Sequence, residues 1–213
     1  MTRRKTTEPT GRARAPRRAA ERAEEPGAAR RNTLLEAAQG VFLRYGFKKT
    51  SMDDLARAAG LSRQGLYLHF KTKEALFKAA LEHLLVQLEA ATRAALAGAG
   101  SLEDRLVAAY EANHGHVFAA SSDHIDELFG TATALIGARF EESERSFAAL
   151  VADELARAGV AAAWKSVGLT AKDLADHLRA ASYGVKHAVT TLAAYHARMR
   201  TAVKLVVRGA PRG

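Results

Sequence analysis

The 213-residue chain contains no cysteine. Disulfide bonds, thiolate zinc sites, cysteine nucleophiles and thiol redox switches are therefore excluded, and a reducing cytoplasm fits this composition best. The chain also lacks a run of about 18 uncharged apolar residues, and its first thirty residues contain no apolar segment of the signal-peptide kind. We therefore expect a cytoplasmic protein that does not enter a membrane.

Several patterns that would indicate catalysis or a β-fold are missing too. The sequence has no G-x-x-x-x-G-K-[ST] phosphate loop, no G-x-S-x-G nucleophile turn and no H-E-x-x-H zinc motif. Alternating β-branched runs are also missing, whereas apolar residues recur at three- and four-residue spacing from Arg31 onward. These features predict an all-α protein that is not an enzyme and needs no cofactor.

Positive charge is concentrated near the N-terminus. The formal net charge is +9, with +5 over residues 1–30, another +5 over residues 31–78, and −1 over the rest. A polyanion such as DNA is the natural partner of the N-terminal third. An anionic membrane surface is the weaker alternative, because no segment combines a basic face with a large aromatic or leucine-rich face.

Residues 1–29 contain no valine, isoleucine, leucine or aromatic residue. Such a segment buries too little apolar surface to offset the entropy of ordering it. We therefore predict a disordered basic arm over residues 1–29. The arm is either a solvated tail or a segment that contacts phosphates or a minor groove.

Residues 30–90 are predicted to form a DNA-binding domain whose first three helices are sharply bounded. The first helix is expected to begin at a Thr33-x-x-Glu36 capping box and to end at Gly46. Its apolar face is formed by Leu34, Ala38, Val41, Phe42 and Tyr45.

A helix-turn-helix is predicted over about residues 53–72. Its first helix follows a pair of hydroxyl residues and ends at Gly60, and Ser62 caps a short second helix. Leu66 and Phe70, four residues apart, return that second helix to the same core. Two short helices joined by a tight glycine turn place the second helix in a DNA major groove.

The remaining side chains of the second helix are expected to face DNA. Arg63 can donate two hydrogen bonds to guanine, Gln64 can pair with adenine, and Leu68 can pack on a thymine methyl group. Nearby hydroxyl, imidazole and ammonium groups suit phosphate oxygens, and Gly65 lets the helix approach closely. The alternative is that these are ordinary surface or half-buried side chains. The predicted DNA-binding set is Thr50, Ser51, Arg63, Gln64, Gly65, Tyr67, Leu68, His69, Lys71 and Lys73.

The segment from Leu34 to Phe77 resembles the DNA-binding domain of TetR/AcrR-family transcriptional regulators. The resemblance rests on F-x-x-x-G-F at 42–47, A-x-x-A-G-L-S at 56–62, L-Y-x-H-F at 66–70 and K-x-K-E at 71–74. It implies a homodimeric repressor on a palindromic operator, with an all-helical C-terminal domain that dimerises and binds a small effector. Binding of the effector would release the double-stranded DNA.

Residues 91–213 are predicted to form this all-helical effector-binding and dimerisation domain. A long helix from about Lys73 to Ala97 links it to the DNA-binding domain. Further helices are expected to begin at Ser101, near Asp123 and at Thr170 and to span residues 132–158 and 192–208, and a loop is expected over residues 160–169.

Apolar stripes on the last two helices predict a dimer seam of four helices, two from each subunit. The alternative is that these stripes only complete the core of a monomer. The stripes are formed by Leu174, Leu178, Ala181, Val185, Leu192, Tyr195, Met199, Ala202, Val203 and Val206.

Aromatic residues of the C-terminal part are candidates for the wall of an effector pocket. The candidates are Phe118, Phe129, Phe140, Trp164 and Tyr183, with His116 and His187 as polar groups; the alternative for each is ordinary core packing. An acid- and histidine-rich stretch from His114 to Glu127 also suggests a metal site, but a His-x-His pair on a helix points its two rings to different faces. We therefore predict no metal.

A second function remains open from the sequence. An architectural DNA-binding protein would use the basic arm and the helix-turn-helix for contacts that are largely independent of sequence, without an effector. It would bind unrelated duplexes with comparable affinity, whereas an effector-controlled regulator would lose operator affinity when its small molecule is added.

Overall fold

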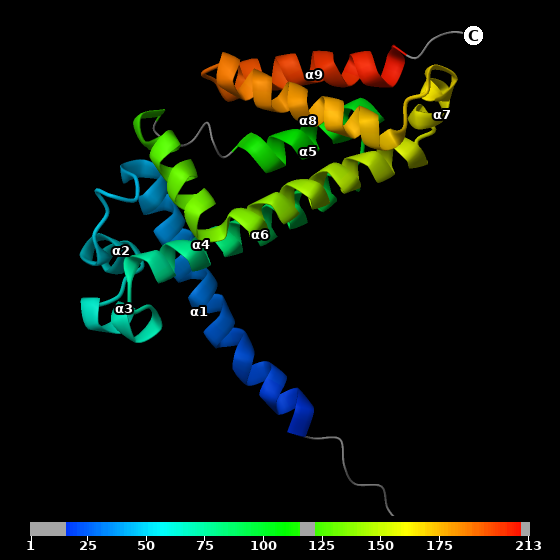
Figure 1. Ribbon diagram of the computed structural model, residues 1–213. Coiled ribbons are helices and arrows are strands. Elements are labelled where there is room, and N and C mark those ends of the chain that lie inside the picture. The colour runs from blue at the N-terminus through cyan, green and yellow to red at the C-terminus, as the bar shows by residue number, and fades with distance from the viewer. Residues whose placement is uncertain (1–15, 116–121, 210–213) are drawn as a thin grey trace, which may run out of the picture.

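The computed structural model describes residues 16–115 and 122–209 (Figure 1). Throughout these two stretches the regular secondary structure is helical, which confirms the prediction of an all-α protein. No helix within them has the length and apolar character needed to cross a bilayer. The elements are α1 (Pro16–Tyr45), α2 (Met52–Ala58), α3 (Arg63–His69), α4 (Lys73–Leu96), α5 (Leu102–His114), α6 (Ser122–Arg157), α7 (Val160–Trp164), the 3-10 turn η2 (Lys165–Val167), α8 (Ala171–Ala188) and α9 (Leu192–Arg208).

Helix α1 begins at Pro16, so the predicted start at Thr33 is wrong, and residues 16–29 are helical rather than disordered. Thr33 lies inside the helix, where its hydroxyl donates to the carbonyl of Ala29 at 3.0 Å instead of capping a helix end. The segment is rich in alanine, arginine and glutamate, which are strong helix formers, although Pro26 and Gly27 inside it are not. Residues 27–33 are exposed, so helix propensity rather than packing supports this part of α1. Residues 1–15 of the predicted arm lie outside the described residues.

Five other predicted helix starts, each after a hydroxyl N-cap, are confirmed. The side chains of Ser51, Ser62, Thr72, Ser101 and Thr170 each accept a hydrogen bond from the backbone N–H three residues later. Each cap supplies a partner for an amide that the helix itself leaves unpaired. The local sequence alone therefore fixes where these five helices begin.

The helices predicted to begin near Asp123 and to span residues 132–158 are both present, but they form one element, α6, which runs from Ser122 to Arg157 and bends at Ile136, where φ −137° and ψ 24° leave the helical region. The prediction of a loop over residues 160–169 is wrong, because this stretch contains α7 and η2. Trp164 explains the order there, because its indole N–H donates to the carbonyl of Val206 in α9 at 2.8 Å.

The helices bury two apolar cores that α4 connects. The N-terminal core is built from α1 to α4 with Leu128 of α6, and the C-terminal core mainly from α5, α6, α8 and α9. Helix α4 contributes Phe77 to the first core and Leu96 to the second, so the predicted boundary between residues 90 and 91 falls inside a continuous helix. In Figure 1, α2 and α3 lie at one end of the molecule, α8 and α9 lie on the opposite side, and α4 and α6 run between them.

The stripes predicted to form a dimer seam are largely buried inside the chain itself. Tyr195, Met199 and Val203 of α9 are 0% exposed, and Leu174 and Leu178 of α8 are at most 3% exposed. These residues complete the monomer core, which was the alternative interpretation of the pattern. A partner that docks on α8 and α9 would have to contact their outward faces instead.

Candidate nucleic-acid interface and ligand cavity

Helices α2 and α3 form the helix-turn-helix. Gly60, at φ +66°, supplies the left-handed conformation that turns the chain between them, and the amide of Leu61 donates to the carbonyl of Ala56 at 2.9 Å. On α3, Leu66 is 0% exposed and the following Phe70 is 6% exposed. These two anchors fix α3 against the core and leave its opposite face open.

The outward face of α3 carries four of the predicted DNA-reading side chains. Arg63, Gln64, Leu68 and His69 are all exposed. Leu68 is 76% exposed, the largest exposed fraction among the large apolar side chains of the described residues. A guanidinium, an amide and an apolar group on one short helix provide the three kinds of contact by which base edges are read in the major groove.

Gly65 and Tyr67, also predicted to face DNA, are half-buried. A Cβ at position 65 would lie 3.2 Å from Oγ of Ser62, the N-cap atom that accepts from the Gly65 amide at 3.0 Å. The glycine therefore leaves room for the helix cap. The Tyr67 ring lies under the Arg63 guanidinium, with 5.7 Å from its carbon to the ring centroid, and so limits the directions that Arg63 can take.

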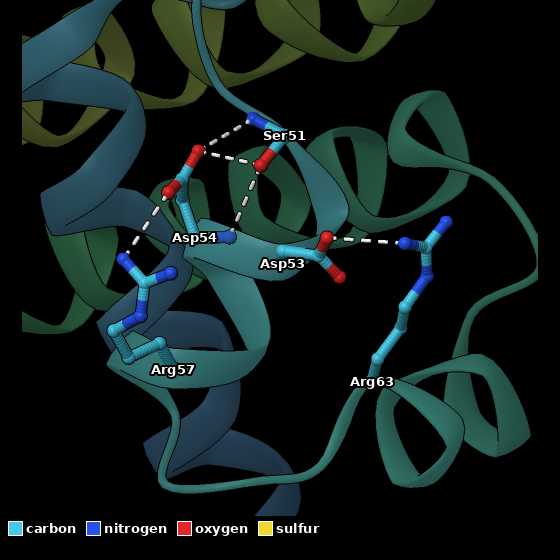
Figure 2. A network of polar contacts seen from close by, with 5 residues as sticks. All are labelled: Ser51, Asp53, Asp54, Arg57 and Arg63. Atoms are coloured by element: carbon cyan, nitrogen blue, oxygen red, sulfur yellow. Dashed lines mark hydrogen bonds and ion pairs between the residues drawn. The ribbon is translucent and has the colours of Figure 1, made fainter.

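Figure 2 shows an ion pair that crosses the helix-turn-helix. A guanidinium nitrogen of Arg63 in α3 lies 3.0 Å from Oδ2 of Asp53 in α2, with side-chain exposures of 64% and 48%. An ion pair this exposed contributes about 0–1 kcal/mol. Arg63 can therefore leave Asp53 at little cost.

Ser51 and Asp54 form a capping box at the start of α2 (Figure 2). The Asp54 carboxylate accepts from the Ser51 amide at 3.1 Å and from its hydroxyl at 2.6 Å, and Arg57 lies 3.5 Å away. The hydrogen bond from the Ser51 side chain, followed by that from its backbone, holds the pKa of Asp54 below its usual value. The Ser51 hydroxyl is exposed but already bonded, so its first role is to fix the end of α2.

Thr50 and Lys73 are placed differently from the expectation that they face phosphates. Thr50 is 3% exposed, and its hydroxyl donates to the carbonyl of Gly46 at 2.6 Å. The Lys73 ammonium donates to the carbonyls of Phe47 at 2.8 Å and Thr50 at 2.9 Å, and lies 4.4 Å from the centroid of the Phe47 ring. Both side chains hold the connection between α1 and α2 in place. Lys71, in contrast, is exposed.

A cavity of about 100 Å³ lies between the two cores. Its wall is contributed by α1, α4, α5, α6 and α8, and most of the lining is apolar. Phe42 of α1 and Phe77 of α4 belong both to this wall and to the core that supports the helix-turn-helix. A molecule in this cavity would touch the DNA-binding domain directly.

The structure brings together some of the residues predicted for an effector pocket. Phe129, Phe140 and Tyr183 line the cavity. Trp164 packs against the C-terminal core away from it, and His187 is exposed outside it. The predictions for His116 and Phe118 lie outside the described residues.

The sequence interpretation missed the polar end of this cavity, which α5, α6 and α8 provide. His114 Nδ1 lies 2.6 Å from Ser182 Oγ, and its Nε2 lies 3.2 Å from Asn113 Nδ2 and 3.9 Å from Glu144 Oε1. Lys186 of α8 completes this end. These residues come from three separate helices, so no local spacing in the sequence could have connected them.

Helix α6 also contacts the connection between α1 and α2. Oε1 of Glu127 accepts from the backbone N–H of Lys48 at 2.6 Å. A Cβ at Gly46, where φ is +80°, would lie 3.0 Å from Oε2 of Glu127 and 3.2 Å from Cβ of His124. The first part of α6 therefore touches the cavity on one side and the start of the helix-turn-helix on the other.

Comparison with known proteins supports this geometry at the N-terminus. Residues 34–80 match the family model described as bacterial regulatory proteins, tetR family. The chain is 34% identical over 99 residues to the uncharacterized HTH-type transcriptional regulator YfiR of Bacillus subtilis, covering 46% of this chain and 40% of that protein. It is 40% identical over 83 residues to the HTH-type transcriptional activator FasR of Mycolicibacterium smegmatis, covering 39% of this chain and 38% of that protein. The matched stretches thus span about two fifths of these curated relatives.

Solved structures share the fold over most of the chain. The fatty acid degradation regulator FadR from Bacillus halodurans superposes with a TM-score of 0.57 at 16% identity, covering 86% of this chain and 97% of that one. The TetR family transcriptional regulator PfmR from Thermus thermophilus superposes with a TM-score of 0.55 at 22% identity, covering 84% and 99%. At these identities the likeness establishes the arrangement of helices.

Proposed function

We propose that this chain, whose N-terminal domain is a TetR-family helix-turn-helix domain, is a sequence-specific DNA-binding transcriptional repressor of the cytoplasm. In this proposal a homodimer binds a palindromic operator in double-stranded DNA, and a small effector in the cavity releases it. The observation that carries the proposal is the open face of α3, where Arg63, Gln64 and Leu68 are exposed while Leu66 and Phe70 anchor the opposite face.

Selection of bound duplexes from a random pool tests DNA reading. A palindromic site with half-sites about 34–36 Å apart is expected, because two-fold proteins place their recognition helices one helical turn apart. Arg63→Ala and Gln64→Ala should each lose about 1–3 kcal/mol of discrimination at one base position. Arg145→Ala, which removes a 71% exposed arginine from α6, is the matched control and should leave the preferred site unchanged. Full preference in both α3 variants would contradict the proposal.

Dimerisation is supported by what α8 and α9 leave on the surface. Leu205 of α9 is 66% exposed and Leu192 is 37% exposed, and the exposed face of α8 includes Gly184 and Ala188. Small residues let helices from two subunits approach closely, and exposed leucines gain from being covered.

A charge placed in this surface tests the dimer. Leu205→Glu should weaken association at least about tenfold, because it buries an unpaired carboxylate. Light scattering over a concentration series measures the mass. Leu68→Glu makes the same change at an exposed leucine of α3 and should leave the mass unchanged. If the Leu205→Glu variant still forms a dimer of unchanged stability, the dimer interface lies elsewhere on the protein.

Control by an effector is supported by the position of the cavity between α1 and α4 on one side and α5, α6 and α8 on the other. A ligand that prefers an arrangement of these helices other than the DNA-bound one weakens operator binding. By linkage, the operator weakens ligand binding by the same factor. The coupling can be tested without a ligand by filling the space. Ala132→Phe inserts a ring from α6 into the cavity wall and should lower operator affinity at least about tenfold.

The exposed neighbour Ala134 gives the matched control, because Ala134→Phe adds the same ring outside the cavity. A folded Ala132→Phe protein with unchanged operator affinity would contradict effector control. If, in addition, unrelated duplexes bound with comparable affinity, the architectural function would replace the proposed one.

A further inference from the structure

The cavity's polar end contains one buried carboxylate oxygen without a hydrogen-bond partner among the described residues. It is Oε2 of Glu144; the other oxygen, Oε1, faces the His114 imidazole at 3.9 Å. Burial pushes the pKa of Glu144 upward, but polar contacts with His114 and Tyr183 and the charge of Lys186 together hold it below the usual value. Glu144 is therefore an ionised acceptor with an unused oxygen, and a buried acceptor left in this state is costly.

Lys186 is the opposite charge at the same end. Its ammonium lies 4.6 Å from the centroid of the Tyr183 ring and 5.2 Å from that of Phe129. Burial lowers the pKa of Lys186, and the negative charge of Glu144 partly opposes this effect. The two aromatic faces stabilise the cation without using its three N–H donors.

The opposite charges of Glu144 and Lys186 face the same cavity but do not form an ion pair with each other. Among the ion pairs found in the described parts of the chain, none joins Lys186 to Glu144, although each lies close enough to shift the pKa of the other. A cationic ligand head would match Glu144 but be repelled by Lys186, and an anionic head would meet the reverse problem. An uncharged head with both a donor and an acceptor satisfies both groups without leaving an excess charge and without bringing further ions into an apolar cavity.

Size and lining describe the rest of the molecule. An apolar cavity of about 150 Å³ holds one benzene ring, and this one measures about 100 Å³, so one ring is the upper size limit for the apolar body of a ligand. Aromatic side chains, among them Phe42, Phe77, Phe129 and Phe140, form much of its wall. Such a space suits one ring or a short aliphatic chain and disfavours a large polar body.

We propose that this cavity binds a small, mainly apolar molecule, with a body no larger than one aromatic ring, whose uncharged head donates a hydrogen bond to Glu144 and accepts one from Lys186. A primary carboxamide is the simplest head of this class. The inference rests on the proposed function only for the role of the cavity as an effector site. The binding chemistry stands on the residues of the cavity itself.

Three planar probes of nearly the same shape test the head group, namely benzamide, benzoate and benzamidinium. Calorimetry or ligand-observed NMR on the full chain without DNA should show benzamide binding at least about tenfold more tightly than either ion. Tighter binding of an ion than of benzamide, or no binding of any probe at millimolar concentration, would overturn the proposal. Because DNA is absent, this result is separate from the operator selection that tests the proposed function.

Two variants exchange the preferences in opposite directions. Glu144→Gln removes the negative charge and should raise the affinity for benzoate about tenfold. Lys186→Met removes the positive charge and should raise the affinity for benzamidinium about tenfold. Glu142→Gln makes the same change as the first variant at a carboxylate of α6 that is 60% exposed and outside the cavity, and should alter no affinity. Thermal unfolding checks that each variant is folded. Unchanged probe preferences in both folded cavity variants would show that these charges do not face the ligand.

Discussion

Replacing Lys73 by methionine separates a structural role from a DNA contact. The variant keeps the length of the side chain but removes the two hydrogen bonds to the carbonyls of Phe47 and Thr50, at 2.8 and 2.9 Å, and the contact of the ammonium with the Phe47 ring. Hydrogen bonds from a charged donor contribute about 1.5–3 kcal/mol each, and an exposed cation–π contact about 0.5–1 kcal/mol. Because Lys73 is only half-buried, we expect a total loss of about 2–3 kcal/mol, below the sum.

Thermal unfolding measures this loss. For a chain of this size 1 kcal/mol corresponds to about 2–4 °C, so Lys73→Met should lower the Tm by about 4–12 °C. Its operator affinity should fall, but the dependence of log affinity on log salt should keep its slope, since no phosphate contact is removed.

Lys71→Met is the matched control, because Lys71 is exposed two residues earlier. It should change stability by less than about 0.5 kcal/mol and, if Lys71 meets a phosphate, reduce the salt slope by about one. The reasoning is refuted if Lys73→Met leaves the Tm unchanged and reduces the salt slope instead.

Three further predictions concern stability. Gly46 has φ +80°, and a Cβ there would lie 3.0 Å from a carboxylate oxygen, so Gly46→Ala should lower the free energy of unfolding in urea by about 1–3 kcal/mol. Gly40 lies in open space on α1, so Gly40→Ala should raise it by about 0.5–1 kcal/mol. Equal effects of the two substitutions would contradict the strain at Gly46. Glu154 is 3% exposed and paired with two arginines, so Glu154→Gln should lower the free energy of unfolding by about 3 kcal/mol, and a loss below the error of the measurement would show that the pair is dispensable. The hydrogen bond from Ser101, then that from an arginine of α9, lowers the pKa of Asp104 from 3.8 to about 2. The ionised carboxylate therefore stabilises the fold above pH 3.8, and this stabilisation is lost as the pH falls through about 2. The Tm of Asp104→Asn should fall less steeply than that of the wild type over this pH range, and parallel curves would refute the assignment.

Local sequence was sufficient where a structure depends on neighbouring residues. A hydroxyl residue before an apolar-periodic segment predicted the starts of five helices, and the i, i+4 pair Leu66 and Phe70 predicted which face of α3 is buried. The open face, with Arg63, Gln64 and Leu68, follows from that burial, because a two-turn helix anchored on one side exposes the other. Sequence did less well for α1, where a capping motif at Thr33 was outweighed by the helix propensity of the residues before it.

Residues whose partners lie far along the chain could not be assigned in this way. Lys73 was expected to meet phosphate because lysines near a recognition helix often do, yet its ammonium is used by carbonyls about 25 residues earlier, at Phe47 and Thr50. The polar end of the cavity brings together His114, Glu144 and Lys186 from three helices, and apolar stripes expected at a dimer seam pack inside the monomer.

The sequence by itself determined the helical class, most helix boundaries, the helix-turn-helix and the identity of its outward side chains, because caps, glycine turns and 3.6-residue periodicity act between residues close in the chain. The tertiary structure alone decided which cations are free to meet DNA, which apolar stripes remain for a partner, and which buried charges face the cavity. These depend on the packing of helices from distant segments, where position in space rather than residue type sets the environment of each side chain.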